Sequence, residues 1–116
     1  MTITRHHVGE RFALAVDTGQ LVFTNGQVAD APKGADTKDQ TAQVLHQIDR
    51  LLEEAGTDKR RIVNATIWLA DLKDLPQMNA AWDAWLDRQS VPARACVGAQ
   101  LANPDWKVEI AVVATK

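Results

Sequence analysis

The chain has 116 residues, of which 46% are apolar and 24% charged, and its formal net charge is −2. That length suits one folded domain with its own hydrophobic core, so residues 1–116 are predicted to form a single domain. The pI near 5.8 gives no sign of the basic surface that nucleic-acid binding requires. Cys96 is the only cysteine, which excludes an internal disulfide. No apolar run resembles a signal peptide or a membrane span, so we expect a cytoplasmic protein without membrane or nucleic-acid partners.

The N-terminal part of the chain predicts a β-hairpin. Residues 12–16 and 21–25 have the apolar composition of strands, and the segment between them contains the turn signal Asp17-Thr18-Gly19-Gln20. Residues 3–8 predict a further, short strand at the edge of the sheet.

A long helix is predicted to follow. Thr37 and Gln40 have the spacing of a capping box at its start, and Gly56 is a natural residue for its end. Apolar residues recur at helical spacing along one face. They are Val44, Leu45, Ile48, Leu51, Leu52 and Ala55.

Residues 61–70 predict a strand with two different faces. The face expected to point toward the core carries Val63, Ala65, Ile67 and Leu69. The opposite face carries Ile62, Asn64, Thr66 and Trp68. A second helix is expected to begin near Asp74, with Pro76 tolerated in its first turn, and to end at Ser90-Val91-Pro92.

The last two strands are predicted at residues 94–100 and 108–114, and we expect them to pair antiparallel. The resulting order, β-β-α-β-α-β-β, predicts an α+β fold in which two helices cover one face of a mixed sheet. The other face would keep apolar groups such as Trp68 and Val113. Because burying apolar surface favours association, we expect a homo-oligomer that packs these bare faces together.

Strand alternation singles out two charges near the C-terminus. Arg94 and Cys96 share one face of their strand, and we expect Arg94 and Glu109, on the next strand, both to lie off the core face. A charge inside an apolar strand is costly unless it is solvated or paired. Arg94 and Glu109 therefore form either a surface or interface salt bridge or part of a functional site.

Several segments share a pattern with one known family. They are Phe23-Thr24-Asn25-Gly26-Gln27, Glu54-Ala55-Gly56, residues 65–72, Met78-Asn79-Ala80-Ala81-Trp82, Val91-Pro92-Ala93-Arg94-Ala95-Cys96-Val97 and Val108-Glu109-Ile110. Together they resemble the RidA/YjgF family of reactive intermediate (enamine/imine) deaminases, over nearly the whole chain from Phe12 onward. The resemblance implies a chorismate-mutase-like fold and a homotrimer with active sites in clefts between subunits. It also implies hydrolysis of 2-imino or 2-enamino acids, such as 2-aminoacrylate, to 2-keto acids and ammonia, without a metal or organic cofactor.

The resemblance also implies roles for individual residues. It places the substrate-binding arginine at Arg94, a catalytic glutamate at Glu109 and a cleft cysteine at Cys96. An arginine fork can hold a carboxylate through two parallel hydrogen bonds. Glu109 could orient the attacking water or carry its proton. Phe12, Asn25 and Gly26 are expected to contact the substrate.

Three positions depart from the family pattern and indicate a divergent branch. Phe12 stands where the family often has tyrosine, so a hydroxyl is missing from the cleft. Asn25 replaces a frequent serine, and either supplies a polar contact or caps a turn. The loop at residues 101–106 is longer than in the archetypal members, and its Trp106 either rims the cleft or packs within the fold.

Cys96 and the pair His6-His7 each allow a chemical interpretation. Cys96 is either a nucleophile or redox sensor, or a polarizable wall of the cleft, and no histidine near it in sequence could activate it. Adjacent strand residues point to opposite faces, so His6 and His7 are poorly placed for one ion and no metal site is predicted.

Two other functions remain open. The Arg94 cleft could bind 2-keto acids or other small carboxylates without turnover, as a metabolic sensor. The chain could also act through protein interactions, as a chaperone or translation inhibitor.

Overall fold

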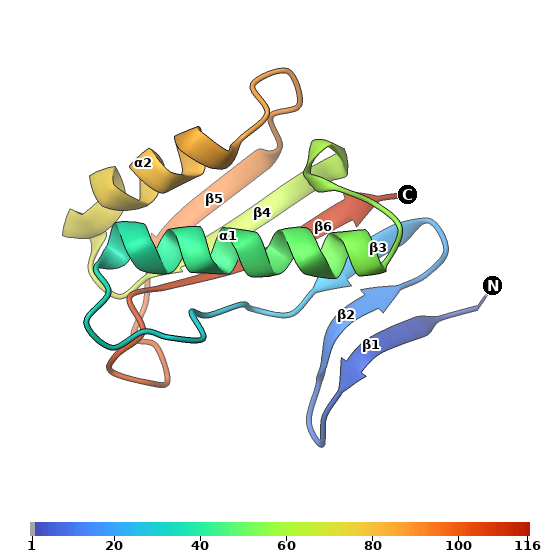
Figure 1. The fold of residues 1–116 in the computed structure, drawn as a ribbon, viewed down its shortest axis with the longest axis horizontal. Coiled ribbons are helices and arrows are strands. Elements are labelled where there is room, and N and C mark those ends of the chain that lie inside the picture. The colour runs from blue at the N-terminus through green and yellow to red at the C-terminus, as the bar shows by residue number, and fades with distance from the viewer. Residues whose placement is uncertain (1) are drawn as a thin grey trace.

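The structure, a computed structural model that describes residues 2–116, has a six-stranded mixed sheet with both helices on one of its faces (Figure 1). The predicted α+β fold is confirmed, and the predicted edge strand is present. The elements in chain order are β1 (Thr4–Val8), β2 (Ala13–Asp17), β3 (Leu21–Thr24), α1 (Thr37–Glu54), the 3-10 turn η1 (Lys59–Arg61), β4 (Ile62–Leu69), the 3-10 turn η2 (Leu72–Asp74), α2 (Leu75–Trp85), β5 (Ala93–Gly98) and β6 (Val108–Thr115).

The strand order in the sheet is β1-β2-β3-β6-β4-β5. β4 and β5 pair parallel because α2 carries the chain back across the sheet between them, whereas the other neighbours pair antiparallel. The expectation that the two C-terminal strands pair with each other is therefore wrong. β6 instead lies between β3 and β4, where both of its edges are hydrogen-bonded, and β5 is left at the edge of the sheet.

The start of α1 differs from the predicted capping box. Asp36 is the N-cap, and its carboxylate accepts a hydrogen bond from the Asp39 N–H at 2.9 Å. Thr37 is therefore the first residue inside the helix, and the buried Gln40 side chain bonds to the backbone of neighbouring loops instead of to the cap. The predicted end is confirmed, since Gly56 has a positive φ of 84°.

The core lies between the helices and the covered face of the sheet. α1 contributes Val44, Leu45, Ile48 and Leu52, α2 contributes Met78 and Trp82, and β6 contributes every second residue from Val108 to Ala114. Two face assignments at the start of β4, those of Ile62 and Val63, are wrong. A bulge between Ile62 and Asn64 shifts the register, so Ile62 is buried while Val63 is 47% exposed.

The second helix begins as predicted, with Pro76 in its first turn, but it ends earlier. The backbone leaves the helical region at Leu86 (φ −63°, ψ 138°), before the predicted stop at Ser90. Trp85, the last residue of α2, donates a hydrogen bond from its indole N–H to Asp49 of α1 at 3.0 Å. This bond ties the end of α2 to α1.

The other face of the sheet is not covered by a helix. It exposes 40% of Phe23 and 47% of Val97, and the Trp68 side chain on the same face is partly accessible. This agrees with the apolar bare face expected from the sequence, and its burial in a homo-oligomer remains a prediction. Within residues 2–116, neither helix has the length and apolar composition needed to cross a membrane.

Candidate functional site

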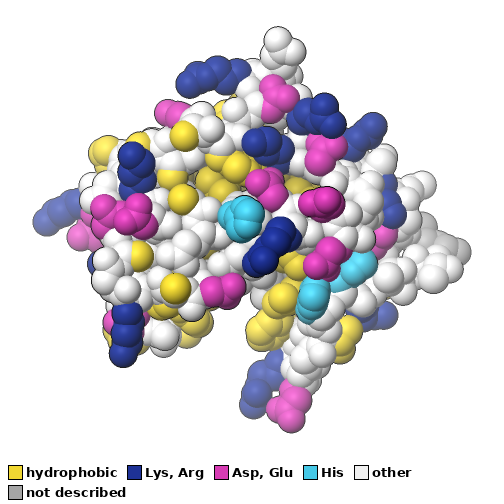
Figure 2. All heavy atoms as spheres, viewed as in Figure 1, with side chains coloured by type: hydrophobic (Ala, Val, Ile, Leu, Met, Phe, Trp, Pro, Cys, Tyr) yellow, Lys and Arg dark blue, Asp and Glu magenta, His cyan; other side chains and the backbone are white. Residues whose placement is uncertain are grey.

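A cleft of about 530 Å³ lies between the N-terminal hairpin and the loop before β6. Figure 2 shows the β1–β2 hairpin projecting from the body of the molecule, with an open notch beside it. The lining residues are Phe12, Leu14, Asn25, Gly26, Gln27, Val28, Asp30, Gln47, Trp106 and Glu109. The structure thus brings together Phe12, Asn25, Gly26 and Glu109 from the predicted set, whereas Arg94 and Cys96 lie elsewhere.

Glu109 enters this cleft from the bare face of the sheet. Its neighbours Val108 and Ile110 point into the core, so alternation directs Glu109 outward, opposite Trp68 of β4. Its carboxylate lies over Gly26, where any Cβ would overlap with it. Burial raises the pKa of the Glu109 carboxyl above its ordinary value, and within residues 2–116 the carboxylate has no hydrogen-bond partner. Such a group is suited to exchanging a proton with a bound water or ligand.

The segment that carries Asn25 and Gly26 is fixed against β6. Gln27 exchanges both backbone hydrogen bonds with Ile110, at 2.8 and 3.1 Å. Asn25 lines the cleft, and its side-chain oxygen accepts a hydrogen bond from the Gln27 side chain at 2.6 Å. This bond links two side chains and caps no backbone turn.

Sequence reasoning missed Gln27 and Gln47 as site residues. Both are buried, and Gln47 donates to the Gln27 side chain at 3.0 Å. A signal was present, because Gln47 interrupts the apolar face of α1 between Val44 and Leu51. A buried amide at such a position needs specific partners.

Arg94 lies on the edge strand β5 and faces the helices. It is in register with the fully buried Ala65, so its side chain leaves the sheet on the covered side. Its guanidinium donates to the Asn79 side chain at 2.9 Å and lies 5.3 Å from the centre of the Trp82 ring. The expectation that Arg94 and Glu109 both lie off the core face is therefore wrong for Arg94.

Arg94 and Glu109 cannot form an ion pair within one chain. They leave the sheet on opposite faces, and β4 separates their strands. The cause is the parallel pairing of β5, which sets the face of Arg94 by its register with β4. Of the alternatives for this pair, an intrachain salt bridge is thus excluded.

Cys96 shares the covered side with Arg94, as alternation predicts. It is in register with Ile67, is partly buried and packs against the core. Burial raises the pKa of the Cys96 thiol, and the nearby Arg94 charge opposes that rise less strongly. A thiol held in its protonated form is a poor nucleophile, so the structure disfavours a nucleophilic Cys96 and shows it packed against the core, outside the lining of the cleft described above.

Phe12 and Trp106 lie on the walls of the cleft, and Phe12 is 60% exposed. Trp106 therefore borders the cleft instead of packing in the core. The His7 ring lies 2.7 Å from the Glu54 carboxylate, and within residues 2–116 no group of three potential metal ligands is found.

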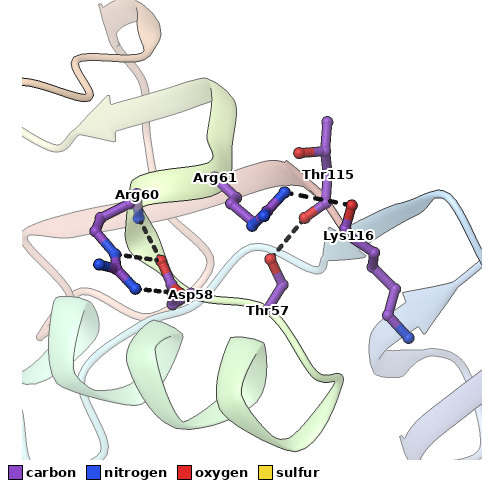
Figure 3. A network of polar contacts seen from close by, with 6 residues as sticks. All are labelled: Thr57, Asp58, Arg60, Arg61, Thr115 and Lys116. Atoms are coloured by element: carbon purple, nitrogen blue, oxygen red, sulfur yellow. Dashed lines mark hydrogen bonds and ion pairs between the residues drawn. The ribbon is translucent and has the colours of Figure 1, made fainter.

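A second cavity, of about 580 Å³, lies beside η1 and the end of β6. Figure 3 shows that both arginines of its lining are engaged: Arg60 pairs with Asp58, at 3.0 Å, and Arg61 donates to the main-chain oxygen of Lys116, at 3.4 Å. The Arg60 hydrogen bonds lower the pKa of Asp58. Thr57 donates to the Thr115 carbonyl oxygen at 2.6 Å, so this network ties η1 to the end of β6.

Comparison with known proteins gives matches over nearly the full length. A family profile described as Endoribonuclease L-PSP matches residues 2–116. The chain is 44% identical over 115 residues to a RutC family protein of Haemophilus influenzae, covering 99% of each chain. It is 33% identical over 111 residues to a 2-iminobutanoate/2-iminopropanoate deaminase of Salmonella typhimurium, covering 90% of this chain and 87% of the relative.

Solved structures agree with these sequence matches. A member of the YjgF protein family from Neisseria meningitidis matches with a TM-score of 0.96 and 44% identity, covering 100% of this chain and 96% of that one. The structure of Escherichia coli TdcF with bound serine matches with a TM-score of 0.84 and 29% identity, covering 94% of this chain and 91% of that one.

Proposed function

The chain belongs to the RidA/YjgF family, and on this premise we propose that it hydrolyses reactive 2-imino or 2-enamino acids, such as 2-aminoacrylate, to 2-keto acids and ammonia. A relative of 33% identity is named as a 2-iminobutanoate/2-iminopropanoate deaminase, and TdcF binds serine, a small amino acid. These names support a small amino-acid-derived ligand. We propose that the reaction takes place in the cytoplasm.

The proposed location of the active site rests on one observation. Arg94 and Glu109 leave the sheet on opposite faces of one chain, so a ligand of a few atoms cannot contact both. Arg94 lies on an edge strand, and the cleft around Glu109 is open to solvent. Edge strands and apolar sheet faces are surfaces at which a second copy can dock. The proposed active site is therefore a cleft between subunits of a homotrimer, with Arg94 from one chain and Glu109 from its neighbour.

The chemistry follows from the two side chains. The Arg94 guanidinium, held by Asn79 and by the Trp82 ring, binds the substrate carboxylate through two parallel hydrogen bonds. An enamine first takes a proton at C3 from water and gives up a proton from its nitrogen to water, and so becomes the imine. Glu109 then accepts a proton from the water that attacks the imine carbon, and returns it as ammonia leaves. Positioning supplies much of the acceleration, because imines already hydrolyse in water.

The first test measures turnover directly. An amino-acid oxidase generates the imine in the assay, and semicarbazide traps whatever remains. The wild-type chain is expected to lower the trapped fraction, and Arg94→Ala is expected to abolish this effect while sedimentation shows an unchanged assembly. Full activity of Arg94→Ala would overturn the site assignment.

Subunit mixing tests whether the site is shared. Arg94→Ala and Glu109→Gln are each expected to be inactive alone. Unfolding and refolding them together in equal amounts should restore about a quarter of wild-type activity, because that share of random interfaces pairs an intact Arg94 with an intact Glu109. No recovery from a correctly assembled mixture would exclude a shared site.

A second candidate function rests on Phe12. A phenyl ring on the cleft wall offers no hydroxyl to the substrate. A cleft that keeps Arg94 but lacks this donor could bind 2-keto acids without turning over imines. Binding of 2-oxobutanoate by calorimetry, together with an unchanged imine lifetime, would support this sensor function over the enzyme.

A further inference from the structure

A chain of side-chain amides connects α1 to the cleft. The side-chain NH₂ group of Gln47 donates to the side-chain oxygen of Gln27 at 3.0 Å and to the backbone carbonyl oxygen of Val28 at 2.9 Å. The side-chain NH₂ group of Gln27 in turn donates to the side-chain oxygen of Asn25 at 2.6 Å. At the other end, the backbone N–H of Asp30 donates to the side-chain oxygen of Gln47 at 3.2 Å. These bonds form one continuous relay from the backbone to Asn25.

Backbone groups fix the direction of this relay. A backbone N–H can only donate and a backbone C=O can only accept, so Asp30 and Val28 determine which side of the Gln47 amide carries the oxygen. With its NH₂ committed toward Gln27, Gln47 requires the Gln27 oxygen to face it. The Gln27 NH₂ then faces Asn25, and the Asn25 oxygen is the end that must turn inward.

The free end of the relay is the Asn25 NH₂ group. Within residues 2–116 it has no acceptor, and Asn25 lies on the cleft wall next to Gly26 and Glu109. Turned the other way, the same amide would offer the cleft an acceptor. A donor at this position attracts oxygen atoms and disfavours ligand N–H groups.

We propose that Gln27 and Gln47 are positioning residues that hold Asn25 with its NH₂ group in the cleft, so that the cleft selects ligands with an oxygen acceptor at this point. Carboxylates, 2-keto acids and the hydrated form of 2-imino acids carry such an acceptor. The inference rests on the proposed function for its ligand class. The direction of the relay itself rests only on the hydrogen bonds and the two backbone groups.

The chain offers a matched control. Gln43 lies one helical turn before Gln47 and exchanges two hydrogen bonds with the Ala31 backbone, both at 3.0 Å. It therefore anchors the same loop but has no contact with Gln27. Gln43→Met and Gln47→Met each remove two hydrogen bonds from α1 to the loop backbone, and only Gln47→Met also breaks the relay.

The binding test uses 2-oxobutanoate as the probe, followed by calorimetry. Gln47→Met should weaken its binding about fivefold to tenfold, since Asn25 loses its fixed orientation, and should raise KM by a similar factor with kcat within about threefold. Gln43→Met should leave Kd and KM within about twofold. Because the relay acts in series, Gln27→Met and the double variant Gln27→Met/Gln47→Met should bind equally weakly. Equal effects of Gln43→Met and Gln47→Met would overturn the proposal.

A spectroscopic test separates this proposal from the proposed function. In the wild-type chain, the Asn25 side-chain NH₂ protons should show nuclear Overhauser contacts with cleft side chains, and the Gln27 NH₂ protons should show them with Asn25. Gln47→Met should remove both sets, whereas Gln43→Met should keep them. If the wild-type chain neither binds 2-oxobutanoate nor turns over imines, the proposed function fails, and these spectra still decide the relay. Unchanged contacts in Gln47→Met would refute the relay.

Discussion

The Glu109 carboxylate occupies the space directly over Gly26 in which a Cβ would lie. The backbone of Gly26 is outside the left-handed region, since the glycines with positive φ are Gly19, Gly34 and Gly56. Gly26 is therefore required for the close approach of a side chain and not for its backbone conformation. A substitution of Gly26 is therefore expected to act on the position of the Glu109 carboxylate and not on the backbone conformation.

Gly26→Ala should inactivate the protein with little loss of stability. The added methyl group must displace the Glu109 carboxylate, which is the end of a flexible side chain, so the free energy of unfolding should change by less than about 1 kcal/mol. Imine hydrolysis should fall about 100-fold or more, the usual contribution of a positioned proton-transfer group. The semicarbazide assay and urea unfolding measure the two effects.

The control for this prediction is the double variant Gly26→Ala/Glu109→Gln. If the methyl group acts only through Glu109, the double variant should be no less active than Glu109→Gln alone. A further loss would show that the added methyl group blocks the ligand directly.

Glu109→Gln should stabilise the protein at neutral pH while abolishing activity. Burial raises the pKa of Glu109 above its value of about 4.5 in an unfolded chain, so ionisation of this group opposes folding. The penalty is absent below the unfolded pKa and complete once the pH exceeds the folded pKa. The variant should therefore resist urea better than wild type at about pH 7, and the difference should vanish near about pH 3. A less stable variant at neutral pH would contradict the prediction.

Cys96→Ala should remain active. The thiol packs against the core, and its raised pKa keeps it protonated, so its removal deletes one contact atom and no nucleophile. We expect kcat within about threefold of wild type and a stability loss of about 1 kcal/mol. Steady-state kinetics and thermal unfolding test this, and a loss of activity by about 100-fold would assign Cys96 a chemical role.

The ion pair between Asp17 and Lys116 should contribute stability that is lost in acid. The Lys116 ammonium lies 2.8 Å from the Asp17 carboxylate, and this hydrogen bond is the main reason that the pKa of Asp17 is lowered. A lowered pKa contributes stability above the unfolded value of 3.8, and that contribution disappears as the pH falls through the folded pKa. Lys116→Met should therefore be less stable than wild type at neutral pH but nearly equal to it in strong acid.

The exposed pair of Arg60 and Asp58 provides the comparison for Lys116→Met. Its side chains are 66% and 44% exposed, so solvent screens their attraction. Arg60→Met should reduce stability at neutral pH less than Lys116→Met does. Equal losses of stability in the two variants would show that the buried position of Asp17 does not strengthen its ion pair with Lys116. Urea unfolding at several pH values measures both variants.

Periodicity predicted the elements whose faces are sharply divided. β6 alternates between buried and partly accessible residues over its whole length, and α1 buries the predicted apolar stripe. Local chemistry also fixed the end of α1 at Gly56. These features depend on neighbours in sequence, which is why the sequence alone revealed them.

Partner choice within the sheet could not be predicted in the same way. Alternation states that Arg94 and Cys96 share a face, but the choice between the two faces depends on the strand beside them. Register with Ala65 of β4 turns Arg94 toward the helices. A local bulge likewise reversed Val63, because one extra residue inverts the alternation that precedes it.

The cleft was predicted in part. Phe12, Asn25, Gly26 and Glu109 meet there, although no sequence spacing links the hairpin to β6. Gln47 escaped notice because glutamine is common on exposed helix faces, as Gln43 of the same helix illustrates, and its place within the apolar stripe of α1 was the one sequence signal of its burial. Gln27 lies outside the helices, where no helical periodicity marks it.

If the opposite orientation of Arg94 and Glu109 reflects a shared site, the activity of the protein depends on its own concentration. If each site is shared as proposed, a dissociated chain is inert, and specific activity falls on dilution below the dissociation constant of the assembly. Total activity would then rise more steeply than the concentration of the chain. A cell would gain protection against reactive imines only after the chain had accumulated past a threshold.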